Sequence, residues 1–179
     1  MLLGSFFDWS GSAFFVLLCL GVVSDIFDGV LARRWGGATE WIRRVDSFVD
    51  RIFYGFVGLV ILLDYFPTIQ TWLFLIVLLL ISELIRFVVD FWKFGRQAAY
   101  HMWLAKLWGV SLLLGFSEIF LTGSGGLLFS LSLVLGIISN IEGLWASLIL
   151  PQWCHDVPSI YHAYQLRQQH IQEQAIKVL

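Results

Sequence analysis

The sequence predicts an all-α protein that crosses a membrane several times, and two observations support this fold class. Of the 179 residues, 59% are hydrophobic and only 13% are charged, whereas soluble domains carry about 25% charged residues. The hydrophobic residues are also gathered into long segments that short polar stretches separate. The chain length accommodates one membrane domain with a handful of spans, since each span needs roughly 20 apolar residues.

Five apolar segments meet that length requirement, and we expect each to be a transmembrane helix. The polar breaks between them contain the glycine and proline residues that are typical of turns. Pro151 closes the last segment. The expected spans are residues 11–32, 42–64, 69–92, 99–122 and 126–150.

Basic residues predict the orientation of this bundle. Lys and Arg residues flank the first and third turns, and the second and fourth turns have none. By the positive-inside rule, the first turn, the third turn and the C-terminal tail are cytoplasmic, and the N-terminus starts outside. The basic residues that carry this prediction are Arg33, Arg34, Arg43, Arg44, Lys93 and Arg96.

We divide the chain into a membrane domain, residues 1–150, and a cytoplasmic tail, residues 151–179. The tail distributes Ile160, Tyr164, Ile171, Ala175 and Val178 among polar residues. One interpretation is an amphipathic helix that lies on the membrane surface or packs on a partner. The other is a partly ordered hydrophilic tail. The chain has no basic tract, so we expect no nucleic-acid partner.

Four aspartates near the cytoplasmic ends of the first two segments are the main functional signal. Asp25 and Asp28 are three residues apart, and Asp46 and Asp50 are four apart, so each pair occupies one face of its helix. Because a short turn makes the two helices antiparallel neighbours, the pairs can face each other. Intramembrane charges are costly and need a partner. The alternative is that these residues cap helix ends or form ion pairs with neighbouring arginines.

Divalent metal ions explain four carboxylates better, because like charges that share a dry site cannot all stay ionised without counter-charge. Carboxylate oxygens are the ligands that Mg²⁺ and Mn²⁺ prefer. Two such ions cancel four negative charges and suit a displacement at phosphorus. Small residues, Gly29 and Ala32, and the guanidinium of Arg33 lie beside Asp28 in sequence. This combination indicates a diphosphate ligand.

These residues resemble a known motif, the signature D-x2-D-G-x2-A-R-x8-G-x3-D-x3-D of the CDP-alcohol phosphatidyltransferases. Seven of its eight fixed positions match over 26 residues, and the similar hydrophobic layout extends to about residue 150. The resemblance implies an enzyme that transfers a phosphatidyl or related phospho group from a CDP-linked lipid donor, such as CDP-diacylglycerol, to an alcohol, with release of CMP in phospholipid biosynthesis. It also implies a homodimer.

The resemblance assigns roles to matching residues. Asp25, Asp28, Asp46 and Asp50 would bind the metal ions, Mg²⁺ or Mn²⁺, and Asp50 would also act as the general base. Gly29, Ala32 and Arg33 would contact the CDP part of the donor. We further expect that Arg96, Lys93 or Arg43 binds an anionic acceptor, although positive-inside anchoring explains these residues equally well.

The sequence departs from the family pattern in two ways. The second signature glycine is replaced by Ile42, in a place where the family approaches the bound nucleotide closely. The family also usually has six spans with the signature starting on the second, and this chain begins almost directly on that helix. We therefore interpret it as a divergent member in which either the first span is lost or the given sequence starts too late to include it.

Two other functions remain as hypotheses. Intramembrane aspartates also serve cation or proton transporters, although transporter sites are usually near the bilayer midplane. A family relative without catalytic activity is the second. The leading prediction is the transferase, in a bacterial-type inner membrane with its active site facing the cytoplasm. The acceptor alcohol is left open. Along residues 69–92 we also expect Glu83, Arg86 and Asp90 to form an ion-pair ladder, because they are three and four residues apart.

Overall fold

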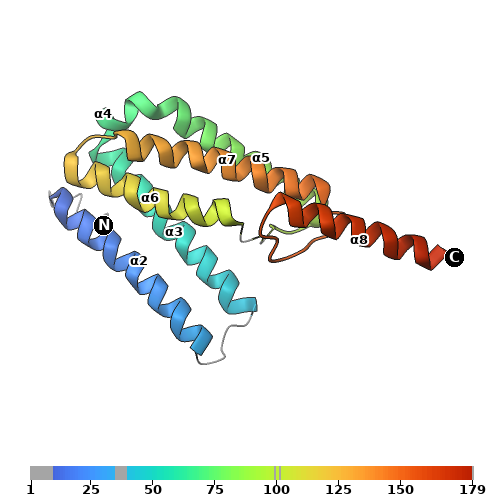
Figure 1. Ribbon diagram of the computed structural model, residues 1–179. Coiled ribbons are helices and arrows are strands. Elements are labelled where there is room, and N and C mark those ends of the chain that lie inside the picture. The colour runs from blue at the N-terminus through green and yellow to red at the C-terminus, as the bar shows by residue number, and fades with distance from the viewer. Residues whose placement is uncertain (1–9, 35–39, 99, 101, 179) are drawn as a thin grey trace. The chain divides into compact units, whose positions relative to one another are not determined.

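The computed structural model describes residues 10–34, 40–98, 100 and 102–178. Within the helices it leaves out the side chains of residues 25–26, 28–34, 40–48, 50–51 and 173–178. The described elements are helices, which confirms the all-α prediction (Figure 1). They are α2 (Gly11–Arg34), α3 (Glu40–Asp64), α4 (Phe66–Ile69), the 3₁₀ helix η1 (Gln70–Trp72), α5 (Leu73–Phe94), α6 (Trp103–Thr122), α7 (Leu127–Ile149) and α8 (Ile160–Val178).

Three helical stretches in the described part of the chain are long and apolar enough to cross a membrane. They are Phe66–Phe94, Trp103–Thr122 and Leu127–Ile149. Helices α2 and α3 contribute shorter apolar stretches, Gly11–Ser24 and Ile52–Asp64, next to the residues whose side chains are not described. These three spans make the chain an integral membrane protein.

Two boundaries differ from the sequence prediction. The third segment is preceded by α4 and η1, because Pro67 occupies the first turn of α4, where its missing N–H costs no hydrogen bond. The fourth segment was expected from residue 99, but α6 begins at Trp103. Gly95 ends α5 in the left-handed conformation (φ 66°). The linker between Gly95 and α6 contains three buried side chains, those of Ala98, Tyr100 and Met102.

The chain packs as two compact units. The first comprises residues 1–71 and 113–129 and contains α2, α3, α4, the end of α6 and the start of α7. Aromatic rings fill its interior. Phe120 of α6 lies with its ring centre 5.5 Å from that of Phe14 on α2 and 5.8 Å from that of Tyr65 after α3. Phe116, one turn earlier on α6, contacts Tyr54 of α3. These contacts hold α2 and α3 against α6.

The turn from α6 to α7 is fixed by the carboxylate of Glu118. Its Oε2 accepts hydrogen bonds from the backbone N–H groups of Gly126 (3.1 Å) and Phe129 (2.9 Å). These donors belong to the first turn of α7 and its approach, where N–H groups have no partner within the helix. Glu118 therefore caps α7.

The second unit comprises residues 72–112 and 130–179. In it, polar side chains join α5 to α7. Arg86 Nη1 donates to Asn140 Oδ1 (3.2 Å), and Asn140 Nδ2 donates to Ser82 Oγ (3.0 Å). Asp90 is completely buried and accepts the hydroxyl of Ser147. The expected ladder along α5 is therefore wrong: Arg86 and Asp90 bond to α7, and Glu83 is exposed.

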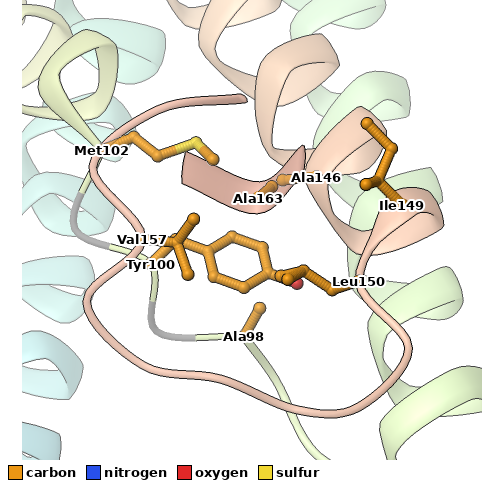
Figure 2. Packing of buried hydrophobic residues seen from close by; sticks show 8 residues of the cluster. All are labelled: Ala98, Tyr100, Met102, Ala146, Ile149, Leu150, Val157 and Ala163. Atoms are coloured by element: carbon orange, nitrogen blue, oxygen red, sulfur yellow. The ribbon is translucent and has the colours of Figure 1, made fainter. Parts of the chain in front are cut away.

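The α5–α6 linker is the centre of the buried cluster in this unit. Figure 2 shows the ring of Tyr100 among Ala98, Leu150 and Val157. The Tyr100 hydroxyl lies 2.9 Å from Ser147 Oγ, and the backbone N–H of Ala98 donates to Asp90 Oδ2 (3.2 Å). Asp90 thus binds the linker and α7 with its two oxygens.

Candidate functional site

The hairpin of α2 and α3 contains most of the predicted site, and the two helices run antiparallel within the first unit (Figure 1). They meet where Gly21 of α2 lies against the ring of Phe53 of α3. A Cβ atom on Gly21 would overlap that ring. The absence of a side chain at Gly21 therefore sets how closely the two helix axes approach.

The register of the aspartates follows from this contact. Asp25 and Asp28 come four and seven residues after Gly21 in α2, while Asp50 and Asp46 come three and seven residues before Phe53 in α3. Residues with these spacings share one face of an α-helix. All four positions thus fall on the contact face of their own helix, on the side of the contact that leads to the α2–α3 connection. Their side chains lie outside the described residues.

The other signature residues fall in the same helices. Gly29, Ala32 and Arg33 belong to the last turns of α2, and Arg43 belongs to the first turn of α3. Their side chains also lie outside the described part. Ile42, which replaces the signature glycine, is in the same turn as Arg43.

Two predicted acceptor ligands belong to the second unit, and both have partners there. Lys93 Nζ donates to the carbonyl oxygens of Ser147 and Leu148, each at 2.9 Å. It therefore neutralises the C-terminal end of α7, where carbonyl groups have no partner within the helix. Arg96 stacks its guanidinium 3.7 Å from the centre of the Trp153 ring. The acceptor role of Lys93 and Arg96 stays a prediction.

Two titratable groups outside the membrane spans have raised pKa values. They are Tyr100 in the linker and Cys154 in the loop before α8. Burial raises the pKa of Tyr100 to about 12, and the nearby Asp90 charge adds to the rise while the hydrogen bond with Ser147 opposes it. The Tyr100 hydroxyl is therefore protonated at neutral pH. Burial also raises the pKa of the Cys154 thiol, which makes it a poor nucleophile.

A metal site is expected only at the aspartates. Among the side chains that the structure describes, no group of three or more His, Cys, Asp and Glu residues is arranged to hold a metal ion. The four aspartates were not part of that set.

Sequence reasoning missed the residues that set the spacing of the hairpin. Gly21 and Phe53 lie outside the signature, and the signal that could have found Gly21 is its spacing of four and seven residues from Asp25 and Asp28. It also missed Tyr100 and Ser147, because Ser147 is 47 residues from Tyr100 and 57 residues from Asp90, its two hydrogen-bond partners.

Comparison with known families decides the assignment. The family model described as CDP-alcohol phosphatidyltransferase matches residues 1–141. The chain belongs to the CDP-alcohol phosphatidyltransferase family. No curated protein and no solved structure matches it significantly.

The match to the CDP-alcohol phosphatidyltransferases includes the whole α2–α3 hairpin and continues into α7, and α8 lies beyond it. Membership implies CDP-alcohol phosphatidyltransferase activity in general, with a CDP-alcohol donor and an alcohol acceptor as substrates. The chain is therefore a transferase of phospholipid biosynthesis with transmembrane helices.

Proposed function

We propose that this chain transfers the phosphatidyl group of CDP-diacylglycerol to a small alcohol or alcohol phosphate, and that the reaction needs two Mg²⁺ or Mn²⁺ ions. The observation that carries the proposal is the register of the α2–α3 hairpin, in which Gly21 and Phe53 meet and all four aspartates follow on the contact faces.

The donor set fits these ions. Two aspartates from each helix supply up to eight carboxylate oxygens, and Mg²⁺ and Mn²⁺ bind oxygen ligands. The close approach of α2 and α3 at Gly21 supports a site that both pairs share. When bound, the ions neutralise phosphate charge and polarise the bond that breaks.

The proposed reaction is a displacement at the donor phosphorus, assisted by Asp50. The acceptor hydroxyl oxygen forms a bond to the phosphorus that carries diacylglycerol, and the bond from that phosphorus to the bridging oxygen breaks, so that CMP leaves with the bond's electron pair. Asp50 takes the proton of the hydroxyl. A positioned carboxylate base contributes about 10²–10⁴-fold to such a rate.

The donor is held on the α2 side of the site. Arg33 would bind phosphate oxygens with its fork of N–H groups, and Gly29 and Ala32 would leave room for the nucleotide to approach the helix. Ile42 adds a branched side chain where the signature has glycine, so we expect a nucleotide pocket that is packed differently from that of the family. Arg43, Lys93 and Arg96 are the proposed acceptor ligands.

We further propose that the protein is a homodimer in a bacterial inner membrane, with the α2–α3 connection on the cytoplasmic side. The basic residues at this connection support the orientation through the positive-inside rule.

The proposal is tested by CMP release from purified protein in lipid nanodiscs with CDP-diacylglycerol, Mn²⁺ or Mg²⁺, and a panel of alcohols. We expect release that depends on the metal and on one class of alcohol. Asp50→Asn should lower kcat by at least about 10²-fold. Glu83→Gln is the matched control, because it removes an exposed carboxylate from α5.

Two results would contradict the proposal. Undiminished activity of Asp50→Asn would exclude Asp50 as the base. No CMP release with any donor, acceptor and metal would exclude the reaction and favour a non-catalytic relative. Ion flux into proteoliposomes in the same preparation would favour the transporter hypothesis.

A further inference from the structure

Two cations from distant parts of the sequence lie close together in the second unit. Lys93 is in the last turn of α5, and Arg167 belongs to α8. Both side chains are exposed, and the positive charge of Arg167 is close enough to repel that of Lys93. Within the part of the chain that the structure describes, neither cation forms an ion pair with a carboxylate. The fold therefore holds two like charges together without a counter-charge from the described side chains.

The packing of α8 imposes this proximity. Ala163 is fully buried in the cluster that includes Ala146 and Ile149 of α7 (Figure 2). Arg167 comes four residues after Ala163 and so lies on the same side of α8, the side that packs on the end of α7. Lys93 reaches the same place, because its Nζ donates to two of the last carbonyl groups of α7. The two charges therefore meet at the end of α7.

Lys93 and Arg167 together are suited to bind a phosphate group. An ammonium group has three N–H donors, and Lys93 uses two of them on α7 carbonyls, so one donor is left. Arg167 presents a planar fork that matches two phosphate oxygens, and no described residue accepts a hydrogen bond from it. Arg96, which stacks on the Trp153 ring just after α5, adds a third positive charge at this end. A phosphate between Lys93 and Arg167 would replace their repulsion by two attractions.

The surroundings of this pair indicate that the phosphate belongs to a membrane lipid. Helices α5 and α7 end here and lie in candidate membrane spans, and the headgroup region of a bilayer lies at the ends of such spans. Trp92, next to Lys93, is 86% exposed, and Leu148 is 53% exposed, so apolar surface continues from the cations along the spans. We propose that Lys93 and Arg167 bind the phosphate of an anionic phospholipid whose acyl chains lie along this surface. Basic clusters at the ends of membrane spans bind such headgroups.

This lipid site goes beyond the proposed reaction, because it needs neither the metal ions nor the nucleotide donor. Lys93 is also a proposed acceptor ligand, whereas Arg167 has no part in that reaction. Helix α8 lies outside the residues that the family model matches, so the site uses a part of the chain that the family assignment does not cover. The decisive variants are therefore placed at Arg167.

Native mass spectrometry of the full chain in detergent, with added phosphatidylglycerol or phosphatidylcholine and without metal or nucleotide, tests this site. Phosphatidylcholine should bind at least about tenfold more weakly, because its own cation would face Lys93 and Arg167. Arg167→Gln should raise the Kd of phosphatidylglycerol about tenfold or more, as expected when charge-assisted hydrogen bonds are lost, and Arg167→Lys should retain part of the affinity.

Lys177→Gln is the matched control, because it removes one positive charge from the same helix. Lys177 is ten residues from Arg167, or roughly 15 Å along the helix axis. Charges separated by more than a Debye length are largely screened, so this variant should change the Kd less than about twofold.

The thermal stability of the same variants separates lipid binding from folding. Without added lipid, Arg167→Gln should not lower the melting temperature, because it removes a repulsion from Lys93 and no described hydrogen bond. A lowered melting temperature would show a structural role and overturn the proposal. Equal affinity of the wild type and Arg167→Gln for phosphatidylglycerol, or equal losses in Arg167→Gln and Lys177→Gln, would also overturn it. Displacement of the lipid by an equal concentration of glycerol phosphate would assign the site to a soluble phosphate and contradict the lipid.

Discussion

Phe53 of α3 lies with its ring directly against Gly21 of α2, where any Cβ atom would overlap it. The spacings of the four aspartates along α2 and α3 are counted from this contact. The absence of a side chain at Gly21 sets the approach of the two helices at this contact, one turn from Asp25 and Asp50 in sequence. Changes at Gly21 should affect the chemistry although Gly21 belongs to no motif.

Gly21→Leu should abolish CMP release and lower thermal stability. The added side chain separates α2 from α3, and overpacking of this kind costs about 1–3 kcal/mol. The matched control is Gly55→Leu on α3, where a Cβ meets no atom within 4 Å. That control should retain activity and gain a little helix stability. Phe53→Ala should restore activity to Gly21→Leu, and failure of this rescue would exclude spacing as the cause.

The Asp90–Ser147 hydrogen bond should behave as a coupled pair in a double-mutant cycle. Asp90→Ala leaves the Ala98 N–H buried without an acceptor and leaves the Ser147 hydroxyl with the Gly143 carbonyl as its acceptor, and the unpaired N–H costs about 1–3 kcal/mol. The losses in free energy of unfolding of the single mutants Asp90→Ala and Ser147→Ala should together exceed the loss in the double mutant. We expect a difference of at least about 0.5 kcal/mol. Unfolding in mixed micelles measures these values. Glu83→Gln with Ser147→Ala should be additive, and additivity of the Asp90 pair would contradict the assignment.

Alkaline pH should destabilise the chain through Tyr100. Burial raises the pKa of Tyr100 from 10.0 to about 12, so the folded state retains a proton that the unfolded state loses. The stabilisation is complete below pH 10 and is lost as the pH rises through about 12. Melting temperatures measured between these pH values should therefore fall for the wild type. The fall should be smaller in Tyr100→Phe and unchanged in Met102→Leu, which alters a buried neighbour that does not titrate. An equal fall in Tyr100→Phe would contradict this origin.

The sequence was sufficient to predict the helices, because the length of an apolar segment and the polar breaks around it are local signals. It located α2, α3, α5 and α7 to within a few residues of their bounds. It failed at residue 99 because the apolar residues Ala98, Tyr100 and Met102 are buried as an irregular linker instead of as a helix. Local hydrophobicity does not distinguish these two ways of burying a side chain.

The site was predictable to a different degree. The spacing of Asp25, Asp28, Asp46 and Asp50 contains the helix period and so indicates shared faces. The spacing does not show which faces of α2 and α3 meet. That depends on the contact between Gly21 and Phe53. Likewise, Arg86 and Asp90 were expected to pair along α5 because sequence reveals neighbours within one helix. Their partners Asn140 and Ser147 come from α7, more than fifty residues away.

The binding of Mn²⁺ by purified protein, followed by the electron paramagnetic resonance signal of the free ion, tests the shared carboxylate site most directly. We predict about two ions bound per chain, one for every two carboxylates. Asp25→Asn in α2 and Asp46→Asn in α3 should each weaken that binding by about tenfold or more, and Glu83→Gln should leave it unchanged. Wild-type binding that persists when the aspartates of either helix are replaced would contradict the account, because one helix alone would then hold the metal.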